Sequence, residues 1–374
     1  MSIDVTVAKR IEGSKVPEDF FGDLAPPESA QRDAIAVAYK RVVLIVHPDK
    51  HAGTPHETTA KDLFRRVTEL KDQALRKVEA KTYGKKHVAS PDEKKPAGPI
   101  VVEIKKKRYV LGDVLYSGDV ADLYACSWGA DDRGLFKIVK NAGDNDLVEN
   151  EGRILEKLGM AEDHAESVYK LFPRLHDSFT LKGKSGSRRV LIIGHYSNHL
   201  SLAEIIEAYP DGVDFRDAAW MWKRMLFAVG HAHRRGIMHG GITPDHVLVH
   251  PTEHGAKILD WTSAVTGGHV KLISKKWKDN YPPEVMAKRP ASAATDIYMV
   301  SACIEELLGL KAVKHEASSV PPAIRDFLKS CLIPAQGRRP DDAWQLHEEL
   351  DELLKALVGK RKYREFKMPA HVRS

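Results

Sequence analysis

Three stretches of the sequence carry polar side chains whose types can handle phosphate and a divalent cation. Lys137 lies in the apolar run GLFKIVK, and Asp260 lies in ILDWTSA. A lysine ammonium can neutralise phosphate charge, and an aspartate can hold one divalent ion. Glu151, in NEGRILEKL, can instead form a purely structural ion pair with Lys137, and these two residues alone favour neither interpretation.

A second group of polar residues follows a predicted helix near the N-terminus. His47, Pro48 and Asp49 form a His-Pro-Asp turn, since a proline ends the helix that precedes it. A zinc site built from His47, His51 and His56 is an alternative, but it lacks a fourth ligand and a recognisable spacing. The tripeptide therefore needs its surroundings before it indicates a function.

The elements around this turn follow from apolar periodicity. Between Ser29 and Val46 apolar residues recur at steps of three and four, which predicts an amphipathic helix that stops at Pro48. A second helical pattern begins at about Thr58. Its apolar stripe comprises Leu63, Phe64, Val67, Leu70, Ala74 and Leu75. We expect two antiparallel helices joined by a loop, within a domain at residues 17–84.

The rest of the chain divides by composition and period. Residues 85–107 are rich in Lys and Pro and predict an exposed linker that ends in a possible strand. Strand-like runs (RYVLGDVLY, DLYACSW, GLFKIVK) then precede a helical segment at 149–158, and helical patterns dominate from Asp214 onward. This order predicts a small β-rich lobe followed by a larger α-rich lobe, together at residues 108–356.

Composition sets the remaining bounds. The 374 residues are 43% hydrophobic and 29% charged, with 58 Lys and Arg against 52 Asp and Glu, as expected of a globular chain. Residues 357–374 form a basic stretch, which we interpret as a solvated tail rather than a nucleic-acid contact. The three cysteines lack C-x-x-C spacing, and no apolar signal core or membrane span is present. We therefore expect a cytoplasmic protein with no membrane contact.

The N-terminal stretch AYKRVVLIVHPDKH, followed by LFRRVTELKDQAL and KTYG, resembles the J-domain of DnaJ-type co-chaperones. His47, Pro48 and Asp49 match its signature turn. The resemblance implies an all-α helical hairpin that docks on a DnaK-type chaperone through this turn and through Lys40 and Arg41, and stimulates ATP hydrolysis there. The chain departs from the family at Ile45, where a basic residue is usual.

The segments that follow resemble, in their order, the protein-kinase fold. LYSGDVADLY matches the Gly-rich loop, although only Gly118 is kept of its glycines. The resemblance implies that Lys137 contacts nucleotide phosphates and that Glu151 pairs with it. It also implies ATP and magnesium as cofactors, either weakly bound or vestigial, with Asp260 as the metal ligand of an altered Asp-Phe-Gly motif.

The stretch HGGITPDHVLV aligns with the kinase catalytic loop but lacks most of its chemistry. His239 matches the loop histidine, whereas Gly241 replaces the catalytic aspartate and Thr243 the loop lysine. His246 replaces the magnesium-binding asparagine, and imidazole is a poor substitute for an amide oxygen. A glycine cannot accept a substrate proton, so this degenerate loop predicts a pseudokinase and no catalytic residues.

Parts that hold the kinase fold together are kept. YPPE places Glu284 at the end of the activation segment, Asp296 begins the central helix, and Arg339 in GRRPDDAW is expected to pair with Glu284. The overall prediction is a multidomain chain in which an all-α J-domain precedes an α+β bilobal protein-kinase-like domain.

Two functions of different classes follow from this arrangement. In the first, the chain is a co-chaperone for a DnaK-type chaperone, and its pseudokinase domain binds nucleotide, a client or a partner protein. In the alternative, it is an atypical Ser/Thr protein kinase that uses Asp245 or Asp260 in place of the missing base, with the J-domain as a targeting module. The client remains unspecified by the sequence.

Overall fold

The computed structural model of the chain forms two compact units, residues 1–96 and 97–374, each of which is considered by itself. The residues that the structure describes are 5–14, 16–22, 24, 28–51, 54–79, 83, 100–130, 132–159, 171–183, 186–196, 198–311, 319–359 and 363–368.

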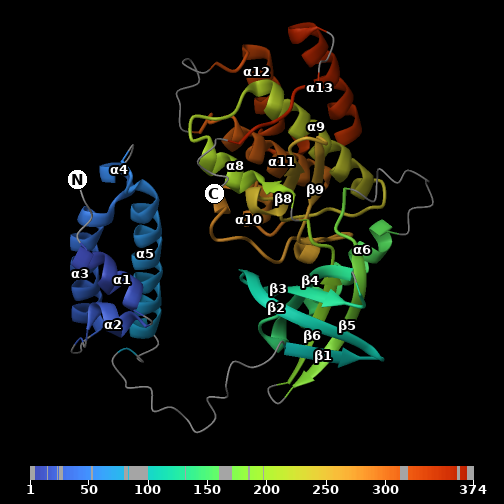
Figure 1. The fold of residues 1–374 in the computed structure, drawn as a ribbon. Helices are drawn as coiled ribbons and strands as arrows, with labels where there is room; N and C mark the ends of the chain where they lie inside the picture. The colour runs from blue at the N-terminus through green and yellow to red at the C-terminus, as the bar shows by residue number, and fades with distance from the viewer. Residues whose placement is uncertain are drawn as a thin grey trace. The chain divides into compact units, whose positions relative to one another are not determined.

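The N-terminal unit is built from helices (Figure 1). They are α1 (Val5–Gly13), α2 (Pro17–Phe21), α3 (Glu28–Val46), α4 (Pro48–His51) and α5 (Glu57–Glu79). The two long helices, α3 and α5, lie side by side and run antiparallel, which confirms the predicted hairpin. Helices α1 and α2 pack across α5, and the sequence analysis did not predict them.

The core of this unit follows the predicted apolar stripe of α5. Leu63, Val67 and Leu70 are buried at steps of four and three, so they share one helix face. They pack against Ile35 of α3 and Phe20 of α2. A hydrogen bond of 3.0 Å between Tyr39 Oη and Thr68 Oγ1 links the two long helices at their partly exposed margin.

The second unit begins with an antiparallel sheet of six strands in the order β1-β2-β3-β4-β6-β5. The strands are β1 (Ile100–Ile104), β2 (Lys107–Ser117), β3 (Ala121–Trp128), β4 (Asp132–Val139), β5 (Leu175–Gly183) and β6 (Gly186–Ile193). Helix α6 (Asn145–Gly159) packs on one face, and the other face buries a separate cluster that contains Tyr109, Phe136 and Phe179. The predicted strand runs correspond to β2, β3 and β4.

The sheet begins before residue 108, the predicted start of this domain. Strand β1 pairs along its length with β2, from Ile100 opposite Leu111 to Ile104 opposite Lys107. The last part of the predicted linker 85–107 is therefore an edge strand of the sheet, and residues 85–99 lie outside the described part of the chain. This strand agrees with the possible strand expected at the end of the linker, and Lys105 and Lys106 form the turn between β1 and β2.

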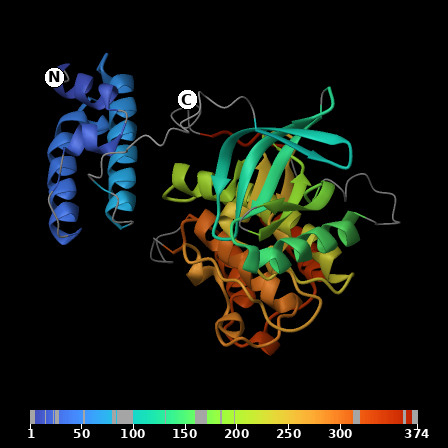
Figure 2. The same cartoon turned by 90° about the horizontal axis from the view of Figure 1, so that it is seen from below.

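The remainder of the domain is mostly helical, and Figures 1 and 2 show the sheet at one end of the domain and these helices at the other. The elements are α8 (Leu202–Ala208), α9 (Phe215–His233), α10 (Pro283–Met286), α11 (Ala293–Leu307), α12 (Pro322–Cys331) and α13 (Ala343–Val358). A small antiparallel sheet of β7 (Leu200–Ser201), β8 (Val247–His250) and β9 (Gly255–Ile258) lies beside α9.

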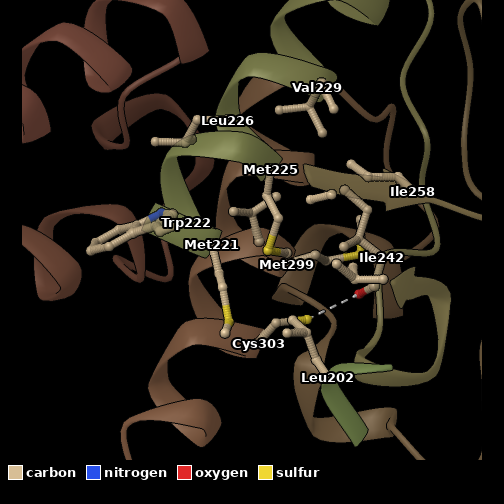
Figure 3. Packing of buried hydrophobic residues seen from close by; sticks show 14 of the residues in the cluster. Leu202, Met221, Trp222, Met225, Leu226, Val229, Ile242, Ile258, Met299 and Cys303 are labelled. Atoms are coloured by element: carbon tan, nitrogen blue, oxygen red, sulfur yellow. Dashed lines mark hydrogen bonds between the residues drawn. The ribbon is translucent and has the colours of Figure 1, made fainter. Parts of the chain in front are cut away.

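Helix α9 organises the core of the helical lobe. Met221, Met225 and Val229 project from one face of this helix at steps of four (Figure 3). Ile242 and Cys303 come from the loop before β8 and from α11, and they complete the contact. Ile242 belongs to the segment 239–246 and is buried in the same cluster as these α9 residues, so the packing helps to fix that segment.

The described part of the predicted solvated tail, residues 357–359 and 363–368, is exposed except at two apolar positions. Phe366 and Met368 are buried in the main core, and the Arg364 guanidinium lies 3.1 Å from the Asp214 carboxylate at the start of α9. The basic composition of this stretch gave no sign that Phe366 and Met368 would be buried, because their burial depends on residues distant in the sequence.

All three cysteines of the chain are free and buried in the second unit. Cys126 lies on β3, Cys303 on α11 and Cys331 at the end of α12. Burial raises the pKa of the Cys126 thiol to about 11.

Candidate functional site

Lys137 and Glu151 meet beneath the sheet. Lys137 is on β4 and Glu151 is on α6, and the Lys137 Nζ atom lies 2.6 Å from Glu151 Oε2. The same nitrogen lies 2.8 Å from Asp260 Oδ1. The structure therefore brings together three of the residues that the kinase resemblance implied, and it adds a direct contact between Lys137 and Asp260 that the sequence had not indicated.

The ionisation of this cluster is set by burial and by opposite charges. Burial would lower the pKa of Lys137, but the carboxylates of Asp260 and Glu151 outweigh it and raise this pKa. Burial likewise opposes ionisation of Asp260, yet the charges of Lys137 and His246 hold its pKa well below the usual range. Burial raises the pKa of Glu151 despite Lys137. The carboxylate of Asp260 is the firmly charged partner of the lysine.

His246 occupies the other side of Asp260. Its Nε2 atom lies 3.2 Å from Asp260 Oδ2, and its Nδ1 atom lies 2.7 Å from the carbonyl oxygen of Gly241. A carbonyl oxygen only accepts, so Nδ1 carries a proton and donates it. The Thr262 hydroxyl also donates to Asp260 Oδ1 at 2.8 Å. Both oxygens of the predicted metal ligand are thus engaged by protein groups.

The donors expected of a magnesium site do not converge here. Mg²⁺ requires near-octahedral oxygen ligands, and His246 presents nitrogen atoms that face the acceptors Gly241 and Asp260. No group of three or more His, Cys, Asp or Glu side chains arranged to hold a metal ion occurs in the described residues. The residues present do not fit the ion that protein kinase domains generally bind.

Gly241 stands where the resemblance aligns the catalytic aspartate, and the space around it is occupied. A Cβ atom at this position would lie 3.1 Å from Ser263 Cβ and 3.2 Å from Ser263 Oγ, closer than ordinary packing permits. Gly240 is in the left-handed region at φ 70°, and a Cβ there would lie 2.8 Å from Val270. Ser263 and Val270 therefore occupy the space that a side chain at these two positions would need.

The backbone of this loop is nevertheless held firmly. Asp296, at the start of α11, accepts hydrogen bonds from the backbone N–H groups of His239 at 2.8 Å and Gly240 at 2.9 Å. His233 Nε2 lies 2.9 Å from the same carboxylate. The His239 ring donates from Nε2 to the Leu259 carbonyl and accepts from the Gly241 N–H at Nδ1. The sequence had assigned Asp296 only to the beginning of a helix.

Arg339 and Glu284 form the predicted architectural pair. Their closest atoms are 2.6 Å apart, and both side chains are fully buried. Arg339 also donates to the Ala294 carbonyl at 2.8 Å, and Thr295 donates to Glu284 at 3.0 Å. These additional hydrogen bonds compensate much of the cost of burying two charges.

The cluster lines a cavity of about 670 Å³ between the sheet and the helical lobe, a size suited to a small organic ligand. Apolar side chains form much of its surface, namely Leu115, Val120, Leu135, Leu248 and Leu259. The predicted Gly-rich loop borders it, and Gly118 makes a tight turn in which its N–H donates to the Ala121 carbonyl at 2.9 Å. The exposed ring of Tyr116 flanks this turn.

Asp245 also faces the cavity, but its carboxylate is occupied. Lys276 Nζ lies 3.0 Å from both carboxylate oxygens, and Trp277 Nε1 donates to Oδ2 at 2.5 Å. Neither Lys276 nor Trp277 was singled out by the sequence analysis. A lysine and a tryptophan side by side carry no recognisable motif, so only the folded chain reveals their partner.

In the N-terminal unit, His47 and Pro48 lie where α3 passes into α4, next to the start of α5. The His47 ring contacts the edge of the Phe64 ring, with centroids 5.3 Å apart. Lys40 and Arg41 are exposed on α3. The side chain of Asp49 lies outside the described part of the structure. The geometry is that of a helical hairpin with the His-Pro turn at its closed end.

Comparison with known proteins identifies the larger unit. Residues 114–365 match the family described as the protein kinase domain, and the chain belongs to this family. Protein kinase domains in general bind ATP and magnesium. The match leaves residues 1–113 outside, so it lends no support to the J-domain resemblance. No match to a curated protein was found.

The question of membrane insertion has one structural observation. Among the described residues, no helix combines the length and the apolar character required to cross a bilayer.

Proposed function

We propose that the kinase domain of this protein binds an adenine-containing ligand in its cleft and does not transfer phosphate. The observation that carries this proposal is Gly241, since the position of the catalytic base has no side chain and Ser263 occupies the adjoining space. The apolar cavity remains large enough for a ligand, and Lys137 remains tethered to Glu151. A cleft without a base favours binding over chemistry.

The neighbouring acids support the same conclusion. Asp260 is held by Lys137, Thr262 and His246, and Asp245 is held by Lys276 and Trp277. Either acid would have to break charge-assisted hydrogen bonds before accepting a proton from a substrate hydroxyl.

The test combines a phosphotransfer assay with a binding measurement. Purified full-length protein, incubated with labelled ATP and generic protein substrates, is expected to phosphorylate neither the substrates nor itself. Adenosine and ATP are expected to raise the unfolding temperature of the kinase domain, because a ligand that binds only the folded state stabilises it. Absence of any shift at millimolar ligand would refute the proposed binding.

Membership of the protein kinase family supports the alternative, an atypical kinase, better than it supports a co-chaperone. Phosphotransfer by the wild-type protein that disappears in Asp245→Ala or Asp260→Ala, with folding intact, would establish this alternative. The matched control is Asp279→Ala, because Asp279 is an exposed aspartate that does not line the main cavity.

The N-terminal helices support a second candidate function, that of a J-domain. The specific observation is the position of His47 and Pro48 at the closed end of the α3 and α5 hairpin, with the exposed cations Lys40 and Arg41 earlier on α3. A rigid turn next to positive charge suits an acidic docking surface on a DnaK-type chaperone. On this proposal, the whole chain is a co-chaperone whose kinase domain recruits a client or partner protein.

An ATPase assay tests the J-domain proposal. The full-length protein is expected to accelerate ATP hydrolysis by a DnaK-type chaperone, and His47→Gln is expected to abolish the acceleration. His56→Gln is the matched control, since His56 lies in the loop before α5 and outside the turn. Equal stimulation by wild type and His47→Gln would overturn the assignment.

A further inference from the structure

We infer that the cleft takes a nucleoside-like ligand without a phosphate chain, and that it binds this ligand without a divalent cation. The inference rests on the proposed function and specifies its ligand class. It follows from a disagreement between the kinase family, which in general uses magnesium and ATP, and the side chains that line this cavity.

The first observation is the state of Asp260. Lys137 and Thr262 engage one carboxylate oxygen, and His246 engages the other. An ion coordinated by this carboxylate would have to displace at least one of these donors. His246 stands where the resemblance places a second, amide-oxygen ligand, and its ring nitrogens face Gly241 and Asp260 instead.

The second observation is the charge of the cavity. Its lining includes three lysines, Lys137, Lys275 and Lys276, and five carboxylates, Asp119, Glu151, Glu204, Asp245 and Asp260. The carboxylates outnumber the lysines by two, and the lining stays negative by one when the positive charge of His246 that acts on Asp260 is added. Lys137 and Lys276 are in addition already paired with carboxylates. A triphosphate that enters without a metal ion meets net repulsion from these walls.

The third observation is that the apolar part of the cavity is intact. Leu135, Leu248 and Leu259 belong to three different segments and all line the same space. Burial of a flat heterocycle between apolar side chains requires neither a cation nor a phosphate. The nucleoside part of a nucleotide is thus expected to contribute favourably to the free energy of binding in this cleft, and the phosphates unfavourably.

Calorimetric titration of the full-length protein with adenosine, AMP and ATP, each in magnesium and in EDTA, tests the inference. The expected result is that adenosine binds at least as tightly as AMP and ATP, with dissociation constants that are the same in both buffers. ATP that binds more tightly than adenosine, and only in magnesium, would overturn the inference while leaving the proposed function intact. Absence of binding by all three compounds would instead refute the proposed function and the inference together.

Two substitutions sharpen the test. His246→Asn supplies an amide oxygen and releases Asp260 Oδ2, so ATP binding by this variant is expected to become stronger in magnesium than in EDTA. His269→Asn is the matched control, because His269 is exposed and does not line the cavity, and it is expected to retain the wild-type pattern. Binding of ATP by His246→Asn that stays independent of magnesium would show that His246 does not exclude the cation, contrary to the inference.

Asp245→Asn examines the charge argument separately. This change removes one negative charge from the lining and releases Lys276. It is expected to strengthen ATP binding more than adenosine binding. An equal effect on the two ligands would contradict the role assigned to the negative lining.

Discussion

Two regions of the kinase domain differ in how much of the kinase pattern they keep. Arg339 and Glu284, in the helical lobe, form a fully buried ion pair with its supporting hydrogen bonds. In the loop, Gly241 and His246 stand where the kinase resemblance places an aspartate and an asparagine, although Asp296 still holds the loop backbone. The comparison teaches that charged groups are kept where they form buried pairs, as Arg339 does with Glu284 and Lys137 with Glu151, because the loss of one partner would leave a buried charge unpaired.

The largest effect is expected when the buried ion pair between Arg339 and Glu284 is broken. Arg339→Met leaves the Glu284 carboxylate buried without its cation, which should lower the free energy of unfolding by about 3 to 5 kcal/mol. Urea unfolding followed by tryptophan fluorescence measures the change, since all six tryptophans lie in the kinase domain. Lys329→Met, which removes a solvent-exposed pair with Asp326, is the control and should change stability by less than about 1 kcal/mol. Similar losses in the two variants would contradict the comparison.

The second effect concerns pH and His239. Burial lowers the pKa of His239 from 6.5 to about 4, although Asp296 opposes the shift. Between these values protons bind preferentially to the unfolded chain, so the free energy of unfolding falls as the pH falls from 6.5 to 4. One such group accounts for up to about 3 kcal/mol.

Urea titrations at a series of pH values test this prediction in the wild type and in His239→Gln. The variant keeps a donor and an acceptor but does not titrate, so its stability should depend less steeply on pH within that window. Parallel pH profiles for the two proteins would show that His239 is not kept neutral by the fold.

A smaller effect is expected when Gly241 is replaced by aspartate. Gly241→Asp forces a side chain against Ser263 and should destabilise the domain by about 1 to 3 kcal/mol, as overpacking generally does. It should gain no phosphotransfer, because His246 and Lys137 still occupy Asp260. Labelled-ATP assays and urea unfolding measure the two quantities. Activity in this single variant would mean that the loop lacks only its base.

The smallest effect is expected at the cavity mouth. Lys276→Met removes a partner of Asp245, but the lysine side chain is 64% exposed and the pair is screened by solvent. The free energy of unfolding should change by less than about 1 kcal/mol in the same fluorescence assay. A loss comparable to that of Arg339→Met would place Lys276 among the groups that hold the fold.

The sequence predicted the parts of the fold that depend on local periodicity. The spacing of Leu63, Val67 and Leu70 was sufficient for α5, and Pro48 was sufficient for the end of α3. The burial of Phe366 and Met368 could not be foreseen in this way, since two apolar residues within a basic stretch form no period. Phe366 contacts Pro251 and Tyr209, which are more than a hundred residues away in the sequence.

The candidate site was predictable in its membership but not in its contacts. Motif order located Lys137, Glu151 and Asp260. The structure places Glu151 and Asp260 within hydrogen-bonding distance of the Lys137 ammonium. The engagement of Asp260 by His246 depends on how the turn after Gly241 directs the imidazole, which residue identity alone does not specify. Whether these residues bind a ligand stays a prediction.

Because all three cysteines are buried, their thiols should not react with thiol-directed dyes while the protein is folded, since the reactive species is the exposed thiolate. Labelling of Cys126 would then report opening of the sheet, and labelling of Cys303 or Cys331 opening of the helical lobe. The N-terminal unit contains no cysteine at all. A single cysteine introduced at the exposed Lys40 would therefore carry a probe to that unit alone, without prior removal of any native thiol.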